Sequence, residues 1–328
     1  MTINWPRFVE IIRTHQRFLL VSHIRPDCDA LGSELGMAGI LEALGKDVRI
    51  VNGQATPPNY KFIDPKNCVK AINLDVQPSE LADREIILVL DTSAWAQLGP
   101  MGEVIKASTA KKIVLDHHVS SDDLGAEQFK DTSSEATGRL VLQAAEQLGV
   151  KITEQIATPL FAAIATDTGW FRFASTSGGT YRAAGTLIDA GVRPNKVYNS
   201  LYEQDTLARL NLMGCILASA KTDMGGRLIY TVVEQTDFKR FGALPSDTED
   251  IVNMTLNVAG TEVAVIMVEQ PTGGFKISFR SRSKVDCSRL AEQFGGGGHK
   301  AAAGAFVGGS ILEAQTKVLD AARAAMTE

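Results

Sequence analysis

Aspartate and histidine side chains occur together at four places in the first half of the sequence. Three of these places directly follow short apolar runs, and the fourth ends a helical pattern. The residues are His23, Asp27 and Asp29; Asp91; Asp116, His117 and His118; and Asp167. If they converge, so many carboxylates need cations to offset their mutual repulsion. Two divalent ions would supply that charge, and Asp91 could bridge them.

The chemistry of such a site follows from its charge and its donor atoms. Two ions roughly 3.5–4 Å apart can share a hydroxide and stabilise both the attacking and the leaving oxygen of a phosphoryl displacement. The pattern therefore predicts a metal-dependent phosphohydrolase in which a metal-bridging hydroxide attacks phosphorus. Imidazole and carboxylate donors without a thiolate favour Mn²⁺, with Mg²⁺ as the alternative.

Each part of the pattern has a simpler interpretation when it is taken alone. Asp91 could begin a helix as an N-cap, and Asp167 could start a turn. Asp116, His117 and His118 could form a polar turn after a strand. Adjacent side chains on a continuing strand point to opposite faces, so we expect one histidine to bind metal and the other to face substrate. The joint pattern favours the metal site over the simpler interpretations.

Strands and helices alternate along the first half of the sequence. Buried strands of a parallel sheet are indicated by apolar runs at 18–21, 48–51, 85–90 and 112–115. Helical patterns lie at 7–17, 135–149 and 153–165, and another follows Ser33. This order predicts an α/β fold with a doubly wound, mostly parallel sheet. The loops after such strands meet at one edge of the sheet, which would bring the candidate ligands together.

The second half of the sequence has a different pattern. Strands are predicted at about 228–233, 263–269 and 275–281, and helices near 249–258, 286–293 and 311–326. We expect a catalytic domain at 1–194, a helical connector at 195–222 and a smaller α/β substrate-binding domain at 223–328. The catalytic cleft would lie between the two domains.

A basic segment followed by glycines marks the predicted substrate-binding domain. Residues 276–300 contain six basic and two acidic side chains. Arg280 and Arg282 are two apart on a predicted strand and share a face, and guanidinium groups bind phosphate in bidentate fashion. Consecutive glycines let backbone N–H groups approach an anion. A flexible turn beside a solvated strand is the alternative, but beside a metal site we expect a nucleotide clamp of Arg280, Arg282, Gly297, Gly298 and His299.

Composition narrows the class of protein. The 328 residues are 45% hydrophobic and carry a net charge of −5, which is ordinary for a globular protein and argues against binding long duplex nucleic acid through many phosphates. No apolar run has membrane-spanning length, and residues 1–7 lack a signal-peptide pattern. The four cysteines are widely spaced, which favours reduced thiols in a cytoplasmic protein.

Together the motifs resemble those of the DHH phosphoesterase superfamily. They are His23-x-x-x-Asp27-x-Asp29-Ala-x-Gly32-Ser33, Asp91-Thr-Ser, Asp116-His117-His118 and Asp167-Thr-Gly. The second half resembles the DHH-associated C-terminal domain, in Arg280-Ser281-Arg282, Val285-Asp286 and the glycine run that ends in His299-x-Ala-Ala-Ala-Gly304. The arrangement is most similar to the branch of short oligoribonucleases and 3′,5′-bisphosphate nucleotide phosphatases, the nanoRNases.

The resemblance implies a role for each candidate residue. One ion would be held by His23, Asp27 and Asp91, and the other by Asp29, Asp91, His117 and Asp167. Asp116 would orient the site without binding metal, and His118 would face the phosphate. The implied catalytic residues are therefore Asp91, Asp116, His117 and His118.

The activity implied by the resemblance is hydrolysis of short oligoribonucleotides to mononucleotides, and of adenosine 3′,5′-bisphosphate (pAp) or linear dinucleotides such as pApA. A cyclic-dinucleotide phosphodiesterase and an inorganic pyrophosphatase are alternatives within the superfamily, although pyrophosphatases carry a different second domain. A non-catalytic nucleotide sensor would lack metal ligands, and every expected ligand type is present here. The resemblance also implies a homodimer, and nothing in the sequence indicates membrane association.

Overall fold

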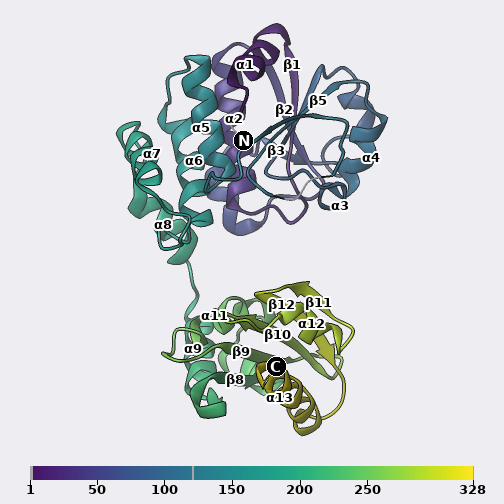
Figure 1. Cartoon of the computed structure of the whole chain (residues 1–328), viewed down its shortest axis with the longest axis vertical. Coiled ribbons are helices and arrows are strands. Elements are labelled where there is room, and N and C mark those ends of the chain that lie inside the picture. The colour runs from purple at the N-terminus through teal and green to yellow at the C-terminus, as the bar shows by residue number, and fades with distance from the viewer. Residues whose placement is uncertain (1–2, 120–121, 328) are drawn as a thin grey trace. The chain divides into compact units, whose positions relative to one another are not determined.

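The computed structural model describes residues 3–119 and 122–327. The chain divides into two compact units, Met1–Gln204 and Asp205–Glu328 (Figure 1). Each unit has its own hydrophobic core on both faces of its own sheet. Each unit is therefore a fold in its own right.

The first unit contains a six-stranded sheet in which every strand pair is parallel. The strand order is β3-β2-β1-β4-β5-β6, so the direction of winding reverses between β1 and β4. The strands are β1 Arg17–Val21, β2 Asp47–Asn52, β3 Val69–Ala71, β4 Ile86–Leu90, β5 Lys111–Asp116 and β6 Glu127–Lys130. The predicted doubly wound, mostly parallel sheet is confirmed.

Helices cover both faces of this sheet, as Figure 1 shows. One face carries α1 Trp5–Thr14, α2 Cys28–Ala43, α5 Thr137–Leu148 and α6 Glu154–Asp167, and the other carries α3 Trp95–Leu98 and α4 Pro100–Ala107. Along β1, Phe18 and Leu20 pack with the first set, while Leu19 and Val21 pack with the second. Burial of each such side chain contributes roughly 1.5–3 kcal/mol, which is why a strand buried on both faces is apolar throughout.

A glycine on α2 sets the distance between α2 and α6. A Cβ atom at Gly32 would lie 2.9 Å from the Cβ of Ala163 and would clash with the carbonyl oxygen of Pro159. Only glycine allows this approach. The close packing carries the last residue of α6, Asp167, toward Asp29 in the first turn of α2.

The second unit contains a six-stranded mixed sheet in the order β11-β12-β10-β9-β8-β7, in which only β8 and β9 are parallel among the pairs described. The strands are β7 Lys221–Asp223, β8 Leu228–Val233, β9 Val263–Glu269, β10 Phe275–Ser281, β11 Gly297–His299 and β12 Ala302–Val307. Its helices are α9 Leu207–Ala218, α10 Gln235–Phe241, α11 Ile251–Thr255, α12 Cys287–Glu292 and α13 Ile311–Thr327. The expected smaller α/β domain is confirmed.

The segment expected to be a helical connector, 195–222, contains two separate helices. The first, α8 Pro194–Tyr202, belongs to the first unit together with α7 Gly178–Asp189. The second, α9, buries Leu212 and Ile216 in the core of the second unit. The boundary between the units falls after Gln204.

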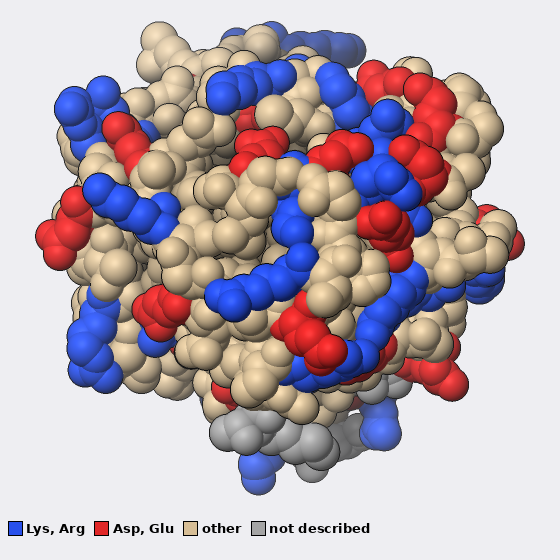
Figure 2. All heavy atoms as spheres, turned by 90° about the horizontal axis from the view of Figure 1, so that it is seen from above, with Lys and Arg blue, Asp and Glu red and all other residues tan. Residues whose placement is uncertain are grey.

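The surface of the molecule is mixed in charge where Figure 2 shows it. Basic and acidic side chains are interspersed over that face, and no broad area of a single sign is seen among its described residues. None of the helices within 3–119 and 122–327 combines the length and the apolar character that a membrane span requires.

Candidate active site

The four groups of aspartates and histidines meet at the carboxyl edge of the first sheet. His23 follows β1, Asp91 follows β4 and Asp116 is the last residue of β5. Asp27 and Asp29 begin α2, and Asp167 ends α6. The centre of the group lies beside the reversal of strand order between β1 and β4, where open α/β sheets leave a crevice for ligands.

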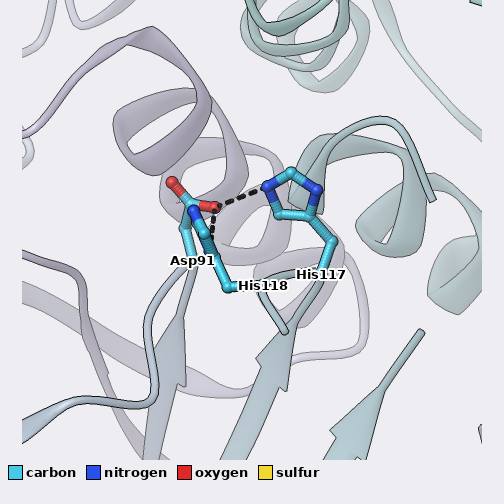
Figure 3. A group of neighbouring side chains, drawn as sticks. All are labelled: Asp91, His117 and His118. Carbon is cyan, nitrogen blue, oxygen red and sulfur yellow. Dashed lines mark ion pairs between the residues drawn. The ribbon is translucent and has the colours of Figure 1, made fainter. Parts of the chain in front are cut away.

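Asp91 is the centre of this group. Its Oδ2 atom lies 3.4 Å from His23 Nε2, and its Oδ1 atom lies 3.6 Å from His117 Nε2 and 3.8 Å from His118 Nδ1. Figure 3 shows both imidazoles directed at one oxygen of the Asp91 carboxylate. Two donors that each lie about 2.1 Å from one ion are at most about 4.2 Å apart, so the spacings of Asp91 to His23 Nε2 and to His117 Nε2 each suit a cation between the two atoms.

Three sets of side chains have ligand atoms close enough for one ion, all within 4.8 Å of one another. The sets are His23, Asp27 and Asp91; Asp29, His117 and Asp167; and Asp91, His117 and His118. His117 Nε2 lies 3.6 Å from Asp167 Oδ2 and 3.8 Å from Asp29 Oδ2. Asp91 and His117 each belong to two sets, so neighbouring ions could share them.

Backbone carbonyl groups orient two of the imidazoles. His23 Nδ1 lies 3.0 Å from the carbonyl oxygen of Ile24, and His117 Nδ1 lies 3.1 Å from that of Ser134. A carbonyl oxygen only accepts hydrogen bonds, so each Nδ1 carries the proton. The Nε2 lone pair is then directed at the carboxylates, as in metal-binding histidines whose second nitrogen donates to a carbonyl.

The carboxylates are buried without enough positive charge around them. Asp29 and Asp91 are each 2% exposed, and burial, with repulsion between the carboxylates, raises the pKa of both. Burial and the nearby Asp29 raise the pKa of Asp167 to about 7. Buried, mutually repelling carboxylates beside imidazole lone pairs are a donor set that fits divalent cations.

Helix α5 holds two of these carboxylates in place. Asp29 accepts hydrogen bonds from the backbone N–H groups of Thr137, at 2.8 Å, and Gly138, at 2.9 Å. The Thr137 hydroxyl donates to Asp91 Oδ1 at 2.9 Å. Asp91 has φ +60°, a left-handed conformation that aspartate adopts more readily than most residues. The sequence motif Asp91-Thr92-Ser93 is therefore a turn that directs the Asp91 carboxylate into the site.

Asp116 is buried but fully paired. It accepts hydrogen bonds from the His118 ring at 2.8 Å and from the Ser93 hydroxyl at 2.8 Å, and it forms an ion pair with Lys130 at 3.0 Å. Burial disfavours its charge, but the hydrogen bonds from His118 and Lys130 outweigh burial and hold the pKa of Asp116 well below its usual range. The same hydrogen bond raises the pKa of His118.

The expectation that His117 and His118 point to opposite faces is wrong. The strand β5 ends at Asp116, so the two histidines are not on a continuing strand. Their rings meet edge to face, 4.5 Å apart, and both adjoin Asp91. What distinguishes them is hydrogen bonding. His117 Nδ1 is hydrogen-bonded to a backbone carbonyl oxygen, whereas His118 Nδ1 is hydrogen-bonded to the Asp116 carboxylate.

An unusual turn follows Asp167. Gly169 N–H donates to Thr166 and Trp170 N–H donates to Ala165, which is the Schellman pattern that ends many helices. The left-handed conformation does not stop at Gly169, at φ +56°, but continues through Trp170, at +58°, and Phe171, at +63°. For bulky side chains this conformation costs roughly 1–2 kcal/mol per residue.

Ring contacts offset the strain of this turn. Trp170 packs against four rings, with centroid distances of 5.0 Å to Tyr198, 5.8 Å to Tyr202, 6.0 Å to Phe161 and 6.2 Å to Phe171. Phe171 stacks on Tyr181 at 5.5 Å. Each such pair contributes about 0.5–1.5 kcal/mol beyond the burial of its area, so together they are of the same order as the cost of the turn.

In the second unit, the two predicted phosphate-binding arginines are bound to the unit's own polar groups. Arg280 donates from Nε to Asn253 Oδ1 at 3.0 Å. Arg282 lies just past the end of β10 and donates to the carbonyl oxygens of Val258, at 2.9 Å, and Thr261. Both guanidinium groups are thus oriented before any ligand binds.

The glycine run of the second unit is part of a strand. Gly297, Gly298 and His299 form β11, at the edge of the sheet, and all three are exposed. A Cβ atom at Gly298 would lie 2.6 Å from the carbonyl oxygen of Ala302, whereas one at Gly297 would meet nothing within 4 Å. Gly298 is therefore required for packing against β12, and Gly297 leaves the exposed side of β11 open.

Comparisons with known proteins place the chain in a family. Residues 17–164 match the DHH family N-terminal domain, and residues 225–328 match the DHHA1 domain. A protein of Thermus thermophilus named "Bifunctional oligoribonuclease and PAP phosphatase NrnA" is 31% identical over 309 residues, which cover 94% of this chain and 90% of that protein. The chain belongs to the DHH family.

Two further proteins are similar over nearly the whole length of the chain, one in sequence and one in structure. A Bacillus subtilis protein of the same name is 28% identical over 304 residues, covering 91% of this chain and 92% of that protein. A crystal structure of an exopolyphosphatase-related protein from Bacteroides fragilis has a TM-score of 0.87 at 26% identity and covers 97% of this chain and 94% of that one. The similarity therefore extends over both domains.

The sequence analysis missed several residues of the DHH domain that support the site. Lys130 and Ser93 bind Asp116, Thr137 binds Asp91, and the Ser134 carbonyl binds His117. None of these residues had a usable signal in the sequence. Lys130 lies beside Asp116 in the pairing of β5 with β6, but that pairing could not be inferred from so short an edge strand.

Proposed function

We propose that this DHH protein hydrolyses short oligoribonucleotides to mononucleotides and also removes a phosphate from pAp or cleaves linear dinucleotides such as pApA. The observation that carries the proposal is the Asp91 carboxylate, buried among three imidazoles and shared by two of the three candidate cation-binding sets. The names of the Thermus and Bacillus relatives support this choice of substrates.

The proposed metal ligands fall into two sets. His23, Asp27 and Asp91 would hold one divalent ion, and Asp29, Asp91, His117 and Asp167 the other. The ions would most readily be Mn²⁺, because imidazole and carboxylate donors are mixed. When bound, they supply Lewis acidity and an activated water for attack on phosphorus. The raised pKa values of Asp29, Asp91 and Asp167 support the need for such cations.

His118, oriented by Asp116, would act on the phosphate rather than bind metal. The His118 Nδ1 proton is bound by Asp116, and Asp116 raises the pKa of the His118 ring. A protonated His118 can donate from Nε2 to a phosphate oxygen and stabilise charge that develops there. Lys130 and Ser93 keep Asp116 ionised and fixed, so the imidazole stays in one orientation.

The DHHA1 domain would hold the nucleotide. Arg280 and Arg282 would bind phosphate or stack on a base, and the exposed strand with Gly297, Gly298 and His299 would offer backbone N–H groups and an imidazole. Their exposure and the existing orientation of both guanidinium groups support this role. We further propose a homodimer that works in the cytoplasm, in keeping with four free cysteines.

A direct assay tests this proposal. Purified protein with Mn²⁺ is given 5′-labelled RNA of two to five nucleotides, pAp, pApA, a 24-mer, pyrophosphate and a cyclic dinucleotide in parallel. We expect rapid loss of the short RNAs and release of phosphate from pAp, with the 24-mer spared. Preferred hydrolysis of pyrophosphate or of the cyclic dinucleotide would replace the proposal with one of those activities.

The Asp91→Asn variant is the matched control for this assay. Asparagine has nearly the same shape and tolerates the left-handed backbone at this position. Residual activity that persists in this variant would come from a contaminating nuclease or from a site other than the one described.

A further inference from the structure

The support of Asp167 differs from that of the other carboxylates. Asp29 accepts two backbone N–H groups and Asp91 accepts a hydroxyl. No hydrogen bond to the Asp167 carboxylate is found among the described residues, and its nearest polar partner is His117 Nε2, at 3.6 Å. Its side chain is also 35% exposed. The position of this carboxylate therefore depends on the end of α6.

The end of α6 is in turn held by the strained turn that follows it. Trp170 N–H reaches back to Ala165 at 2.6 Å, and Arg172 N–H reaches back to Thr168 at 2.9 Å. Trp170 and Phe171 are both left-handed, a conformation that bulky residues leave unless their surroundings impose it. Released from its packing, this turn would relax, and Asp167 would move with it.

The packing that imposes the turn comes from other helices. Tyr198 and Tyr202 of α8 contact the Trp170 ring at 5.0 and 5.8 Å, and the two tyrosine rings contact each other at 5.0 Å. Tyr181 of α7 stacks on Phe171, with ring planes inclined by 22°. None of these rings belongs to the candidate ligand sets.

We propose that Trp170, held by Tyr198 and Tyr202, is a positioning residue for Asp167 and so determines how tightly the set of Asp29, His117 and Asp167 binds its divalent cation. This inference rests on the proposed function, because it assumes that the set binds a metal. It adds that affinity for one of two ions is set by an aromatic contact outside the ligands. Loss of that contact should weaken the binding of the ion held by Asp29, His117 and Asp167. The affinity of the set of His23, Asp27 and Asp91 should stay unchanged.

The experiment compares Trp170→Ala with Trp170→Phe. Mn²⁺ alone is titrated into metal-free protein without substrate, with free Mn²⁺ measured by electron paramagnetic resonance. We expect two ions on the wild type. Trp170→Ala should lower the affinity for one of the two ions by about 10- to 100-fold, as loss of an orienting group does, and leave the affinity for the other unchanged. Trp170→Phe keeps a ring in place and should stay within about threefold of wild type for both ions.

Kinetics provide a second readout. At low Mn²⁺, Trp170→Ala should lower kcat with little change in KM for a dinucleotide, and excess Mn²⁺ should restore much of the lost kcat. If this variant does not fold, Tyr198→Leu against Tyr198→Phe repeats the comparison from the other side of the contact.

The outcomes separate the inference from the proposed function. Failure of wild-type protein to bind Mn²⁺ would overturn the proposed metal site and the inference with it. Two ions bound by Trp170→Ala with wild-type affinities would overturn the inference alone. An equal loss of affinity for both ions would also overturn the inference, because the substitution would then have damaged the whole domain.

Discussion

The carboxylate site of the DHH domain and the basic strand of the DHHA1 domain both concentrate charge, but the protein compensates the two differently. At the first, Asp29, Asp91 and Asp167 converge with imidazoles and too little positive charge, and their pKa values rise. At the second, Arg280 and Arg282 already donate to oxygens of their own domain. The carboxylates of the first region therefore lack sufficient positive charge, whereas the arginines of the second region already have hydrogen-bond partners within their own domain.

The same contrast exists inside the carboxylate site, between two buried aspartates that follow neighbouring strands. Asp116 has an ammonium, a hydroxyl and an imidazole as partners, and its pKa is lowered. Asp91 has the Thr137 hydroxyl and imidazoles at 3.4–3.8 Å, and its pKa is raised. Removing one partner of a paired buried carboxylate destabilises the fold, whereas an unpaired carboxylate is available for a cation.

The first prediction tests this contrast with Asp91→Asn. Loss of the shared ligand should lower kcat by about 10³-fold or more, since metal stabilisation of the transition state amounts to several kcal/mol. The same change removes a buried, repelled carboxylate and should raise the unfolding free energy of the metal-free protein by about 1–2 kcal/mol. Activity assays and thermal unfolding without metal measure the two effects. A less stable metal-free variant would mean that Asp91 is already compensated in the fold.

The second prediction is the opposite behaviour of Asp116→Asn. The Lys130 ammonium would lose its buried partner, which should lower the unfolding free energy by about 3–5 kcal/mol. His118 would lose its anionic partner, so kcat should fall by about 10- to 100-fold. Chemical unfolding and steady-state kinetics at saturating Mn²⁺ provide the measurements. Unchanged Mn²⁺ affinity is expected as well, and a large loss of affinity would make Asp116 a ligand.

The third prediction concerns pH. The folded, metal-free domain keeps protons on Asp29, Asp91 and Asp167 that the unfolded chain releases near pH 4. Its stability should therefore fall as pH rises from about 4 through 7, the pKa of Asp167. Ions must displace these protons, so Mn²⁺ affinity should rise by up to about tenfold between pH 6 and pH 7 for each proton released.

Thermal unfolding at pH 6 and pH 8, with and without Mn²⁺, checks this prediction. The stabilisation by Mn²⁺ should be larger at pH 8. In Asp91→Asn the difference between the two pH values should shrink, because fewer protons are displaced. A stabilisation that is equal at the two pH values in wild type would show that the carboxylates are ionised before metal binds.

How far the sequence could predict these regions depends on how local their causes are. The convergence of the candidate ligands could be predicted because each lies just after a strand, at its last residue, or at the start or end of a helix, and parallel strands bring such positions to one edge. The strands β3 and β6 were not predicted, because they are only three and four residues long, lie at the two edges of the sheet and contain no apolar run. Without β6, the partner Lys130 could not be placed.

Causes that depend on packing were also out of reach. The left-handed turn at Trp170 and Phe171 depends on rings from α7 and α8, and α7 begins with two glycines that weaken a helical pattern. The four consecutive glycines predicted a backbone that approaches an anion, with a flexible turn as the alternative. In the structure, Gly298 is needed for the packing of β11 against β12. The same residue type served two purposes that spacing alone does not separate.

The last prediction compares the two arginines at the end of β10, Arg280 and Arg282. The Arg282 guanidinium joins two carbonyl oxygens of one loop, at Val258 and Thr261, and a lysine ammonium cannot match that planar fork. Arg282→Lys should therefore lower the unfolding free energy by about 1 kcal/mol. Arg280 donates to the Asn253 side chain and to the adjacent Phe279 carbonyl oxygen, and Arg280→Lys should change the unfolding free energy by less than about 0.5 kcal/mol.

Both arginine variants should raise KM for a dinucleotide by about 3- to 10-fold at nearly unchanged kcat, since a bidentate contact to phosphate becomes a single one. Asn253→Ala is the control, because it removes the side-chain partner of Arg280 without removing its charge and leaves the contact with the Phe279 carbonyl oxygen in place. KM should then change less than in Arg280→Lys. If Arg282→Lys loses stability while KM is unchanged, Arg282 is a structural residue of the DHHA1 domain. Its charge would then serve its carbonyl partners in the same domain and would not bind the substrate. If KM rises without any loss of stability, the carbonyl contacts of Arg282 contribute nothing to the fold and serve only to orient it for the substrate.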